Sequence, residues 1–365
     1  MGDPHGIGIV GLGAISAQYL ATIESHPLVK IVAVADLNES RAREVAAETG
    51  AEAVTVDQLV DDPRVDTVLN LTIPAAHADI ALRAIAAGKH VYGEKPLAAT
   101  FGEAERVVEA ARAAGATVGC APDTVLGTGI QTAREAVDAG RIGTPTAATA
   151  TMIAPGHELW HPNPDFYYAE GGGPLLDMGP YYVTSLVHLL GPVVSVSGAA
   201  GRSRDVRTIR SGPRAGERIP VTVDTHVTGI LEHAGGALST IVMSFEGLTT
   251  EAPPIEVQGT EGSLAVPDPN HFDGEVTLRS LGREGSVALP VSAGYAEAGR
   301  GVGLVDMLRA DPDRPARADG ALGLHVLEVM TAVLDSAAAG KRLEMTTSVE
   351  RPSLVPLSER GAWTG

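Results

Sequence analysis

Cysteine is almost absent from this 365-residue chain, which holds only Cys120. A single cysteine excludes a disulfide within the chain, and its apolar surroundings indicate a core residue rather than a reactive thiol. The N-terminus carries no basic segment followed by a cleavage site, which argues against a signal peptide. No apolar run approaches the about 18 residues that a membrane span needs. The sequence therefore predicts a cytoplasmic protein.

Aromatic residues and positive charge are also scarce. Aromatics make up 4% of the chain, and the formal net charge is -18. Such an acidic surface repels phosphate backbones and anionic lipids, so nucleic acids and membranes are poor candidate partners and a small-molecule ligand is expected. With 44% hydrophobic residues the chain can bury a large core, and its length suits two domains.

The first part of the chain alternates short β-branched runs with Ala-rich helical patterns. This alternation predicts a doubly wound parallel sheet of the Rossmann type, an α/β domain over residues 1–122. Gly50, Gly88 and Gly115 follow the helical patterns, where a left-handed residue commonly ends a helix. The expected strands are 7–10, 31–35, 67–71, 90–92 and 117–120, and the expected helices are 14–25, 39–48, 75–87 and 102–114.

The remaining residues, 123–365, predict an α+β domain for substrate binding and oligomerisation. Strand-like runs separated by turns predict a largely antiparallel open sheet with helices on one face, near residues 176–190 and 320–339. The flat face of that sheet suggests a homodimer or homotetramer. The Arg-rich stretch 202–214 is interpreted as a solvated hairpin or loop. The expected strands are 146–153, 193–198, 222–232, 236–246, 255–259, 262–266 and 275–280.

A glycine-rich turn follows the first strand and reads Gly11-Leu12-Gly13-Ala14-Ile15-Ser16. Gly11 permits a tight turn, Gly13 lets the backbone approach a pyrophosphate, and the next helix offers its positive N-terminus to that anion. Asp36 ends the second strand, at the spacing expected of an acid that binds ribose hydroxyls. A carboxylate there repels a 2′-phosphate, so NAD is expected rather than NADP. Arg41 is expected to lie in solvent.

Two further loops end strands of the predicted parallel sheet. Thr72-Ile73-Pro74-Ala75-Ala76-His77 follows one strand, and Glu94-Lys95-Pro96 follows the next. Ligands of open α/β sheets bind at such carboxyl ends. A lysine beside the cationic nicotinamide has its proton affinity lowered, which suits acid–base work on a hydroxyl. The residues expected to contact the cofactor are Gly11, Gly13, Ala14, Ile15, Asp36, Leu37, Thr72, Ile73, Pro74, His77, Glu94 and Lys95.

Together with the run Gly171-Gly172-Gly173-Pro174-Leu175-Leu176-Asp177-Met178-Gly179, these motifs resemble the Gfo/Idh/MocA family of oxidoreductases, which includes glucose–fructose oxidoreductase and inositol dehydrogenase. The resemblance covers nearly the whole chain. It implies that Lys95 takes part in proton transfer and that Asp177 orients substrate and lysine. It also implies an oligomeric protein.

The chain departs from the family pattern at position 181, where tyrosine replaces the usual histidine. A tyrosine hydroxyl both donates and accepts, and a lysine cation would stabilise its phenolate. The glucose–fructose oxidoreductase branch and the dimeric dihydrodiol dehydrogenases resemble this chain in using tyrosine there. The alternative is that Tyr181 is only a packed aromatic. If the segment is helical throughout, Asp177, Tyr181, Thr184 and His188 form one polar stripe. Pro180 predicts that the helix begins near 176–179.

The expected substrate-binding residues include several in the segment that precedes the glycine run. Residues 157–168 are rich in polar groups and flat rings, which suits a sugar, although a stiff connector is an equal alternative. Asp123 follows a strand end and is expected to contact a hydroxyl. No metal site is expected, because His157 and His161 lack a third ligand. The expected set is Lys95, Asp123, His157, Trp160, His161, Asp177 and Tyr181.

The sequence therefore predicts an NAD-dependent dehydrogenase acting on CH–OH groups of a sugar, glycoside or inositol. A second possibility is a glycoside lyase or hydrolase that oxidises its substrate transiently, with no net redox change. A third is a sugar-sensing regulator without turnover. The presence of Lys95 and Asp177 argues against that third class.

Overall fold

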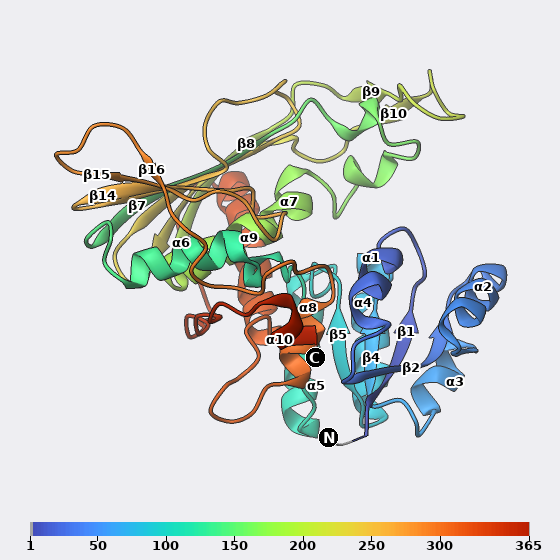
Figure 1. The fold of residues 1–365 in the computed structure, drawn as a ribbon. Coiled ribbons are helices and arrows are strands. Elements are labelled where there is room, and N and C mark those ends of the chain that lie inside the picture. Colours follow the sequence, from blue (N-terminus) through green and yellow to red (C-terminus); the bar gives the residue numbers. More distant parts are fainter. Residues whose placement is uncertain (1–2, 365) are drawn as a thin grey trace. The chain divides into compact units, whose positions relative to one another are not determined.

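The computed structural model describes residues 3–364 and divides into two compact units, coloured along the chain in Figure 1. The first holds the residues up to Thr128, Ala293–Leu327 and the residues from Pro352 onward; the second holds Gly129–Ser292 and Glu328–Arg351. This differs from the predicted division at residue 122, because two late segments return to the first unit. Isolated bridges pair Gly119 with Asp319 and Gly127 with Tyr295, contacts that a pattern along the chain does not reveal.

The first unit is built on a six-stranded parallel sheet, ordered β3-β2-β1-β4-β5-β6. This order is that of the doubly wound dinucleotide-binding fold, which confirms the predicted class. Gly50 and Gly115 are left-handed caps, as expected. The strands are β1 (His5–Val10), β2 (Val29–Ala35), β3 (Glu52–Ala53), β4 (Thr67–Asn70), β5 (His90–Gly93) and β6 (Val118–Cys120). The helices are α1 (Ser16–Ile23), α2 (Glu39–Thr49), α3 (Val56–Asp61), α4 (Pro74–Ala86), α5 (Phe101–Ala114), the 3₁₀ helix η1 (Thr124–Leu126), α8 (Val302–Leu308) and α10 (Arg360–Thr364).

The core of this unit joins the sheet to the late helix α8. Ile7, Ile9 and Tyr92 from the strands are buried together with Tyr19 of α1 and Leu304 of α8. Burying one such side chain contributes about 1.5–3 kcal/mol. Cys120 is buried as well, and desolvation raises the pKa of its thiol, in agreement with the predicted core position.

The second unit is built on a nine-stranded mixed sheet, ordered β16-β15-β14-β13-β7-β12-β11-β8-β17. Its pairs are antiparallel except β7 with β12, so the largely antiparallel prediction is confirmed. The strands are β7 (Pro145–Ile153), β8 (Val193–Gly201), β11 (His226–His233), β12 (Leu238–Ser244), β13 (Ile255–Gly259), β14 (Gly262–Val266), β15 (Thr277–Ser280), β16 (Val287–Ala288) and β17 (Leu343–Glu344). A separate pair is β9 (Val206–Thr208) and β10 (Arg218–Pro220).

Helices cover one face of this sheet, as predicted (Figure 1). Along β11 the burial alternates: Val227 and Leu231 face the helices, whereas Ile230 lies half exposed on the open face. Gly198 lacks a Cβ that would collide with the carbonyl of Val333, so a helix can lie directly on β8. The helices of this unit, of which α6, α7 and α9 lie against the sheet, are α6 (Thr128–Asp138), η2 (His157–Leu159), η3 (Asp165–Tyr167), α7 (Pro174–Leu190) and the later part of α9 (Gly320–Ala339).

Helix α7 corrects one expectation about its start. It begins at Pro174 and runs through Pro180 without a break, whereas the proline predicted a start near 176–179. Pro174 occupies the first turn, where its missing N–H costs nothing. Beyond Pro180 every residue to Leu190 is buried, so tertiary packing outweighs the lost backbone hydrogen bond.

Helix α9 corrects another expectation. It is long and apolar enough to pass for a membrane span by length and composition, although no such run was expected. Half of its most apolar window is buried inside the protein. A core helix of a globular protein has these same properties, so the helix is weak evidence for a membrane segment.

Candidate functional site

The glycine-rich turn joins β1 to α1 in the geometry that a bound diphosphate requires. Gly11 has φ +91°, and a Cβ there would lie 2.8 Å from the backbone of Leu71 and Thr72. A Cβ on Gly13 would meet nothing within 4 Å and would project into open space. Ser16, in the place of a third glycine, is buried and donates its hydroxyl proton to the carbonyl of Gly13 at 2.7 Å.

Asp36, at the end of β2, ties this turn to the start of α2. Its Oδ2 accepts a hydrogen bond from the backbone N–H of Leu12 at 2.7 Å, and its Oδ1 accepts one from Asn38 at 2.7 Å. Arg41 does not simply extend into solvent as expected. Its Nε donates to the carbonyl of Leu12 at 3.2 Å, and its guanidinium pairs with Glu44 at 2.7 Å.

A pocket of about 460 Å³ opens above the turn, entirely within the first unit. The backbone at Gly13, which no side chain covers, suits the diphosphate of a dinucleotide, and the carboxylate of Asp36 suits its ribose. Eight of the predicted cofactor contacts line it: Gly11, Gly13, Ala14, Ile15, Asp36, Leu37, Thr72 and Ile73. The lining also includes Val10, Val56, Leu71, Ala76 and Ile80, which sequence analysis did not single out. Apolar side chains of this kind carry no distinguishing signal in a sequence.

Pro74 and His77 do not line the pocket but belong to its support. Pro74 is the first residue of α4. His77 is buried, and its ring nitrogens lie 3.0 Å from the carbonyl oxygen of Thr72 and 2.7 Å from that of Pro96. The histidine thus joins the loop after β4 to the loop that carries Lys95.

Glu94 and Lys95 follow β5 at the same carboxyl edge of the sheet, and neither lines the pocket. The carboxylate of Glu94 accepts the hydroxyl proton of Tyr19 at 2.7 Å and the backbone N–H of Lys95 at 3.2 Å. Tyr19 was missed from the sequence. The available signal was a tyrosine on the buried face of a helix, because a buried phenol needs a partner.

Asp123 is placed differently from the expected hydroxyl contact. It is fully buried, and its Oδ2 accepts the backbone N–H groups of Gly301 at 2.7 Å and Gly303 at 3.1 Å, at the start of α8. Burial raises the pKa of this carboxyl, against the opposing effect of Arg300. The burial of Asp123 is therefore explained by the late segment 293–327, which covers the end of β6. The sequence had predicted that this strand end is open to substrate.

In the second unit, Asp177 lies in the first turn of α7 and is paired with a residue twenty positions earlier. Nε2 of His157 lies 3.1 Å from Oδ2 of Asp177, and both side chains are mostly buried. The ring of His157 contacts Tyr167 at 3.9 Å between centroids and Trp160 at 5.2 Å. The structure thus brings together two residues, Asp177 and His157, that the sequence proposed separately.

The other predicted residues of this unit lie on the same two segments. Trp160 is 60% exposed, and the His161 ring contacts it at 5.4 Å. Tyr181 lies one turn beyond Asp177 on α7 and is 6% exposed. The predicted polar stripe has helical spacing, but its far end is packed inside: Nδ1 of His188 lies 3.4 Å from Nε2 of Gln131.

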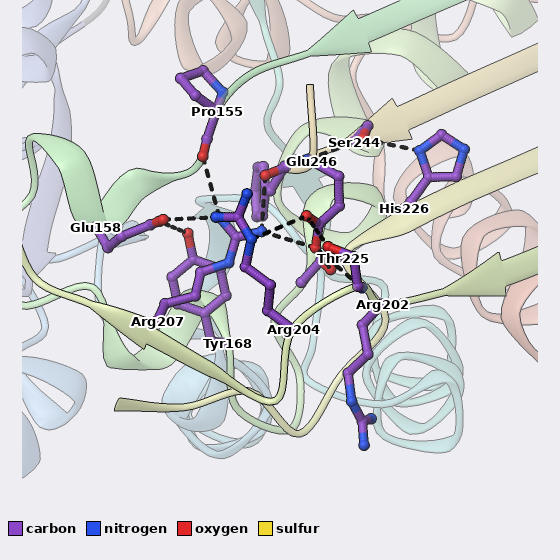
Figure 2. Close-up of polar contacts among 12 residues, drawn as sticks. Pro155, Glu158, Tyr168, Arg202, Arg204, Arg207, Thr225, His226, Ser244 and Glu246 are labelled. Carbon is purple, nitrogen blue, oxygen red and sulfur yellow. Dashed lines mark hydrogen bonds and ion pairs between the residues drawn. The ribbon is translucent and has the colours of Figure 1, made fainter. Parts of the chain in front are cut away.

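The burial of Arg207 contradicts the prediction from the sequence. The residue lies in the Arg-rich stretch interpreted as a solvated hairpin or loop. Strands β9 and β10 do form a hairpin there, but the side chain of Arg207 in β9 is fully buried rather than solvated. Figure 2 shows its guanidinium between the carboxylates of Glu158, at 2.8 Å, and Glu246, at 2.9 Å. It also lies over the ring of Tyr168. Its partners are distant in the sequence, so no local signal marked it.

No cluster of three or more His, Cys, Asp or Glu side chains suited to a metal occurs among residues 3–364. The two histidines of the aromatic segment are engaged separately. His157 meets Asp177, and Nδ1 of His161 accepts the backbone N–H of Asn163 at 3.1 Å.

Comparison with known proteins finds similar sequences among sugar and inositol oxidoreductases. The chain is 28% identical to 1,5-anhydro-D-fructose reductase of Ensifer adhaerens, over 94% of this chain and 99% of that protein. It is 29% identical to myo-inositol 2-dehydrogenase of Thermotoga maritima, over 71% of this chain and 74% of that protein. The crystal structure of an NAD-binding oxidoreductase from Klebsiella pneumoniae shares the fold, with a TM-score of 0.82 and 24% identity, and covers 95% of this chain and 100% of its own.

Family models match both parts of the chain. Residues 5–121 match an oxidoreductase family with an NAD-binding Rossmann fold, and residues 130–265 match the GFO/IDH/MocA C-terminal domain. These matches agree with the resemblance carried by the glycine-rich turn, Glu94-Lys95-Pro96 and the Gly171–Gly179 run. Because together they span more than half of its length, the chain belongs to the Gfo/Idh/MocA family of NAD-binding oxidoreductases.

Proposed function

We propose that this protein is an NAD-dependent dehydrogenase acting on a CH–OH group of a sugar, glycoside or inositol. The observation that carries the proposal is the pocket of about 460 Å³ over the glycine-rich turn, with Asp36 in its wall. Lys95 follows β5 at the same edge of that sheet. The carbohydrate class is supported by the relatives, which are named for anhydrofructose and for inositol.

The residues present fit a dinucleotide, and NAD is the proposed form. The open space beside Gly13 leaves room for a diphosphate, and Asp36 offers a carboxylate for ribose hydroxyls. The negative charge of Asp36 disfavours a 2′-phosphate. Arg41 is engaged by Glu44 and by the carbonyl of Leu12, so it is not poised as a phosphate ligand. Pro74, His77, Glu94 and Lys95 complete the proposed set of cofactor residues.

Bound nicotinamide supplies the hydride acceptor or donor, and the protein supplies placement and proton transfer. We assign catalysis to Lys95, Asp177 and Tyr181. Lys95 or Tyr181 takes the proton of the reacting hydroxyl, and Asp177 orients the substrate by accepting a hydrogen bond from a neighbouring hydroxyl. Glu94, held by Tyr19 at 2.7 Å, fixes the turn that carries Lys95.

For the substrate we propose the aromatic segment together with Asp177. Trp160 offers an exposed flat face, and the rings of His157 and His161 flank it. A sugar presents both apolar C–H faces and hydroxyl groups, which such a surface matches. Asp123 is the weakest member of the predicted set, because its carboxylate already caps α8.

Two wider features are also proposed. We assign the open face of the second unit's sheet to a homodimer or homotetramer contact. Ile230 and Leu238 are half exposed on neighbouring strands of this face. The single buried cysteine supports a cytoplasmic location.

The test is the appearance of NADH absorbance across a panel of free sugars, glycosides and inositols. Lys95→Ala should lower kcat strongly while NADH binding, measured by fluorescence, persists. Lys30→Ala, at an exposed position on β2, is the matched control and should leave both unchanged. Comparing Tyr181→Phe with Lys95→Ala separates the two proton acceptors, since the true acceptor loses more of kcat.

The second candidate function is a lyase or hydrolase that oxidises a glycoside transiently and returns the hydride. It requires the same pocket and lysine but predicts tightly held NAD and no NADH release. This second function would be favoured if the protein binds NAD and cleaves a glycoside but produces no NADH with any compound of the panel. A regulator without turnover is disfavoured by the presence of Lys95 and Asp177.

A further inference from the structure

We propose that His157 is the positioning residue of Asp177, supplying from outside α7 the imidazole that the helix lacks at position 181. This inference rests on the proposed function, because it concerns how the carboxylate of that reaction is held. It changes the role of His157 from substrate contact to partner of Asp177.

The first support is the geometry of the pair. Nε2 of His157 lies 3.1 Å from Oδ2 of Asp177, with side chains 13% and 18% exposed. An ionised carboxylate only accepts hydrogen bonds, so Nε2 carries the proton. A hydrogen bond to a fixed donor restricts rotation of the carboxylate. It thereby fixes the orientation of the carboxylate.

The second support is the other ring nitrogen. Nδ1 of His157 is buried and has no hydrogen-bond partner among the described residues 3–364. A buried N–H without an acceptor costs about 1–3 kcal/mol, so the neutral ring with its proton on Nε2 is the favoured tautomer. Because Nδ1 has no hydrogen-bond partner among the described residues, it offers no route for a proton taken from Asp177. Its part is therefore to position the carboxylate rather than to relay a proton.

The third support is the immobility of the ring. It lies edge-on to Tyr167 at 3.9 Å between centroids and contacts Phe245 at 4.6 Å. Such packing restricts the ring to one rotamer, and restricted rotamers are what hold a catalytic group in a productive orientation.

The fourth support is the buried network that anchors the backbone of this segment (Figure 2). The N–H of His157 donates to the hydroxyl of Tyr168 at 2.9 Å, and that hydroxyl donates to Glu158. Arg207 binds Glu158 at 2.8 Å and the carbonyl of Pro155 at 3.1 Å. Both sides of His157 are thus tied to strand β9. This network makes the segment stiff, and its contact with substrate stays a proposal.

Two variants separate hydrogen bonding from packing. His157→Phe keeps an aromatic ring in the cluster but removes the donor, whereas His157→Gln places an amide N–H at a similar reach. With the panel's best substrate, H157F should lower kcat roughly 10- to 100-fold, the effect of losing a hydrogen bond to a charged group. The affinity for NADH should change less than about twofold, and H157Q should recover most of kcat. His271→Gln, at an exposed position, is the matched control.

The pair is also tested without turnover, by two-bond ¹H–¹⁵N NMR spectra of protein labelled in its histidine rings. The signal lost in H157Q is assigned to His157 and should report the tautomer protonated at Nε2. Asp177→Asn should perturb that signal, whereas Asp224→Asn should not.

The proposal is overturned if His157 carries its proton on Nδ1, if D177N leaves its signal unchanged, or if H157Q and H157F lose kcat equally. Should wild type be inactive across the panel, the proposed function fails. The NMR result would still decide whether the pair exists.

Discussion

The hydroxyl of Tyr19 donates a 2.7 Å hydrogen bond to Oε1 of Glu94, across 75 positions of sequence. The bond joins α1, which follows the glycine-rich turn, to the turn that carries Lys95. Tyr19 is fully buried, and burial raises the pKa of its phenol well above the usual range, so the group stays protonated and donates. Cofactor turn and lysine turn are thus fixed to each other within one unit.

Removing this donor tests its effect on Lys95. Tyr19→Phe leaves an oxygen of the partly buried Glu94 carboxylate without this donor, which should cost about 1 kcal/mol of folding free energy. We expect kcat to fall roughly tenfold, while the Kd for NADH changes little. Thr22→Ala, on the same helix, should change neither. An equal loss of NADH binding and kcat would show that Tyr19 supports the fold rather than the lysine.

The carboxylate of Asp36 should decide between NAD and NADP. Asp36→Ala removes two acceptors near the ribose and the charge that disfavours a 2′-phosphate. The KM for NAD should rise roughly 10- to 100-fold, and use of NADP should improve. Steady-state kinetics with both cofactors measures the change. Glu39→Ala removes a charge from the exposed face of α2 and serves as control. An undiminished preference for NAD would contradict the assignment.

Arg207 should be among the most costly charges to remove. Arg207→Met leaves Glu158 buried without its cation, a change that typically costs about 3–5 kcal/mol. Arg202→Met, at an exposed pair with Asp205, should cost less than about 1 kcal/mol. Urea unfolding in a Trp363→Phe background lets Trp160 report on the second unit, because these are the only two tryptophans. Equal midpoints for the two arginine variants would refute the prediction.

Glu328 should make the second unit sensitive to acid. Burial acts to raise the pKa of this carboxyl, but hydrogen bonds from Thr346 and Thr347 outweigh it and lower the pKa below its ordinary value of 4.5. A lowered pKa contributes stability that is fully present above 4.5 and is lost as pH falls through the folded-state value. The destabilisation caused by Glu328→Gln should therefore be largest at neutral pH and shrink below pH 4.5, as measured by unfolding at several pH values. A penalty independent of pH would contradict this.

The proposed subunit contact can be tested at Ile230. This side chain is 49% exposed in the middle of β11 and lies opposite Ser197 and Thr240 on its neighbours. A glutamate there would be desolvated by a second sheet, so Ile230→Glu should yield monomers in size-exclusion chromatography with light scattering. Leu281→Glu, on an exposed turn, should leave the mass unchanged. If I230E has the same mass as the wild-type oligomer, this face is not the subunit contact.

Local patterns predicted most of the regular structure because each depends on neighbouring residues. The β-branched runs that became β1, β2 and β4 are buried on both faces, which a parallel sheet between helix layers requires. Short elements such as β3 and α3 were missed, since so few residues show no period. Helix α7 continued through Pro180 because burial of its second half outweighed a local rule.

In the candidate site, too, the sequence predicted the residues that are close together along the chain and missed the contacts between distant ones. The glycine-rich turn and Asp36 are separated by one helix and one strand, so spacing alone placed them together, and eight predicted residues line the pocket. Asp123, His157 and Arg207 have partners contributed by distant segments. Their roles as helix cap, carboxylate partner and buried cation followed from contacts with Gly301, Asp177 and Glu158.

The sequence by itself determined the two sheets, the dinucleotide turn and the family, because these follow from hydrophobic period, turn chemistry and short-range spacing. Only the tertiary structure decided which charges are buried and which polar atoms meet. Burial removes water from a charge and makes a partner obligatory, and that partner is chosen by the fold rather than by position along the chain.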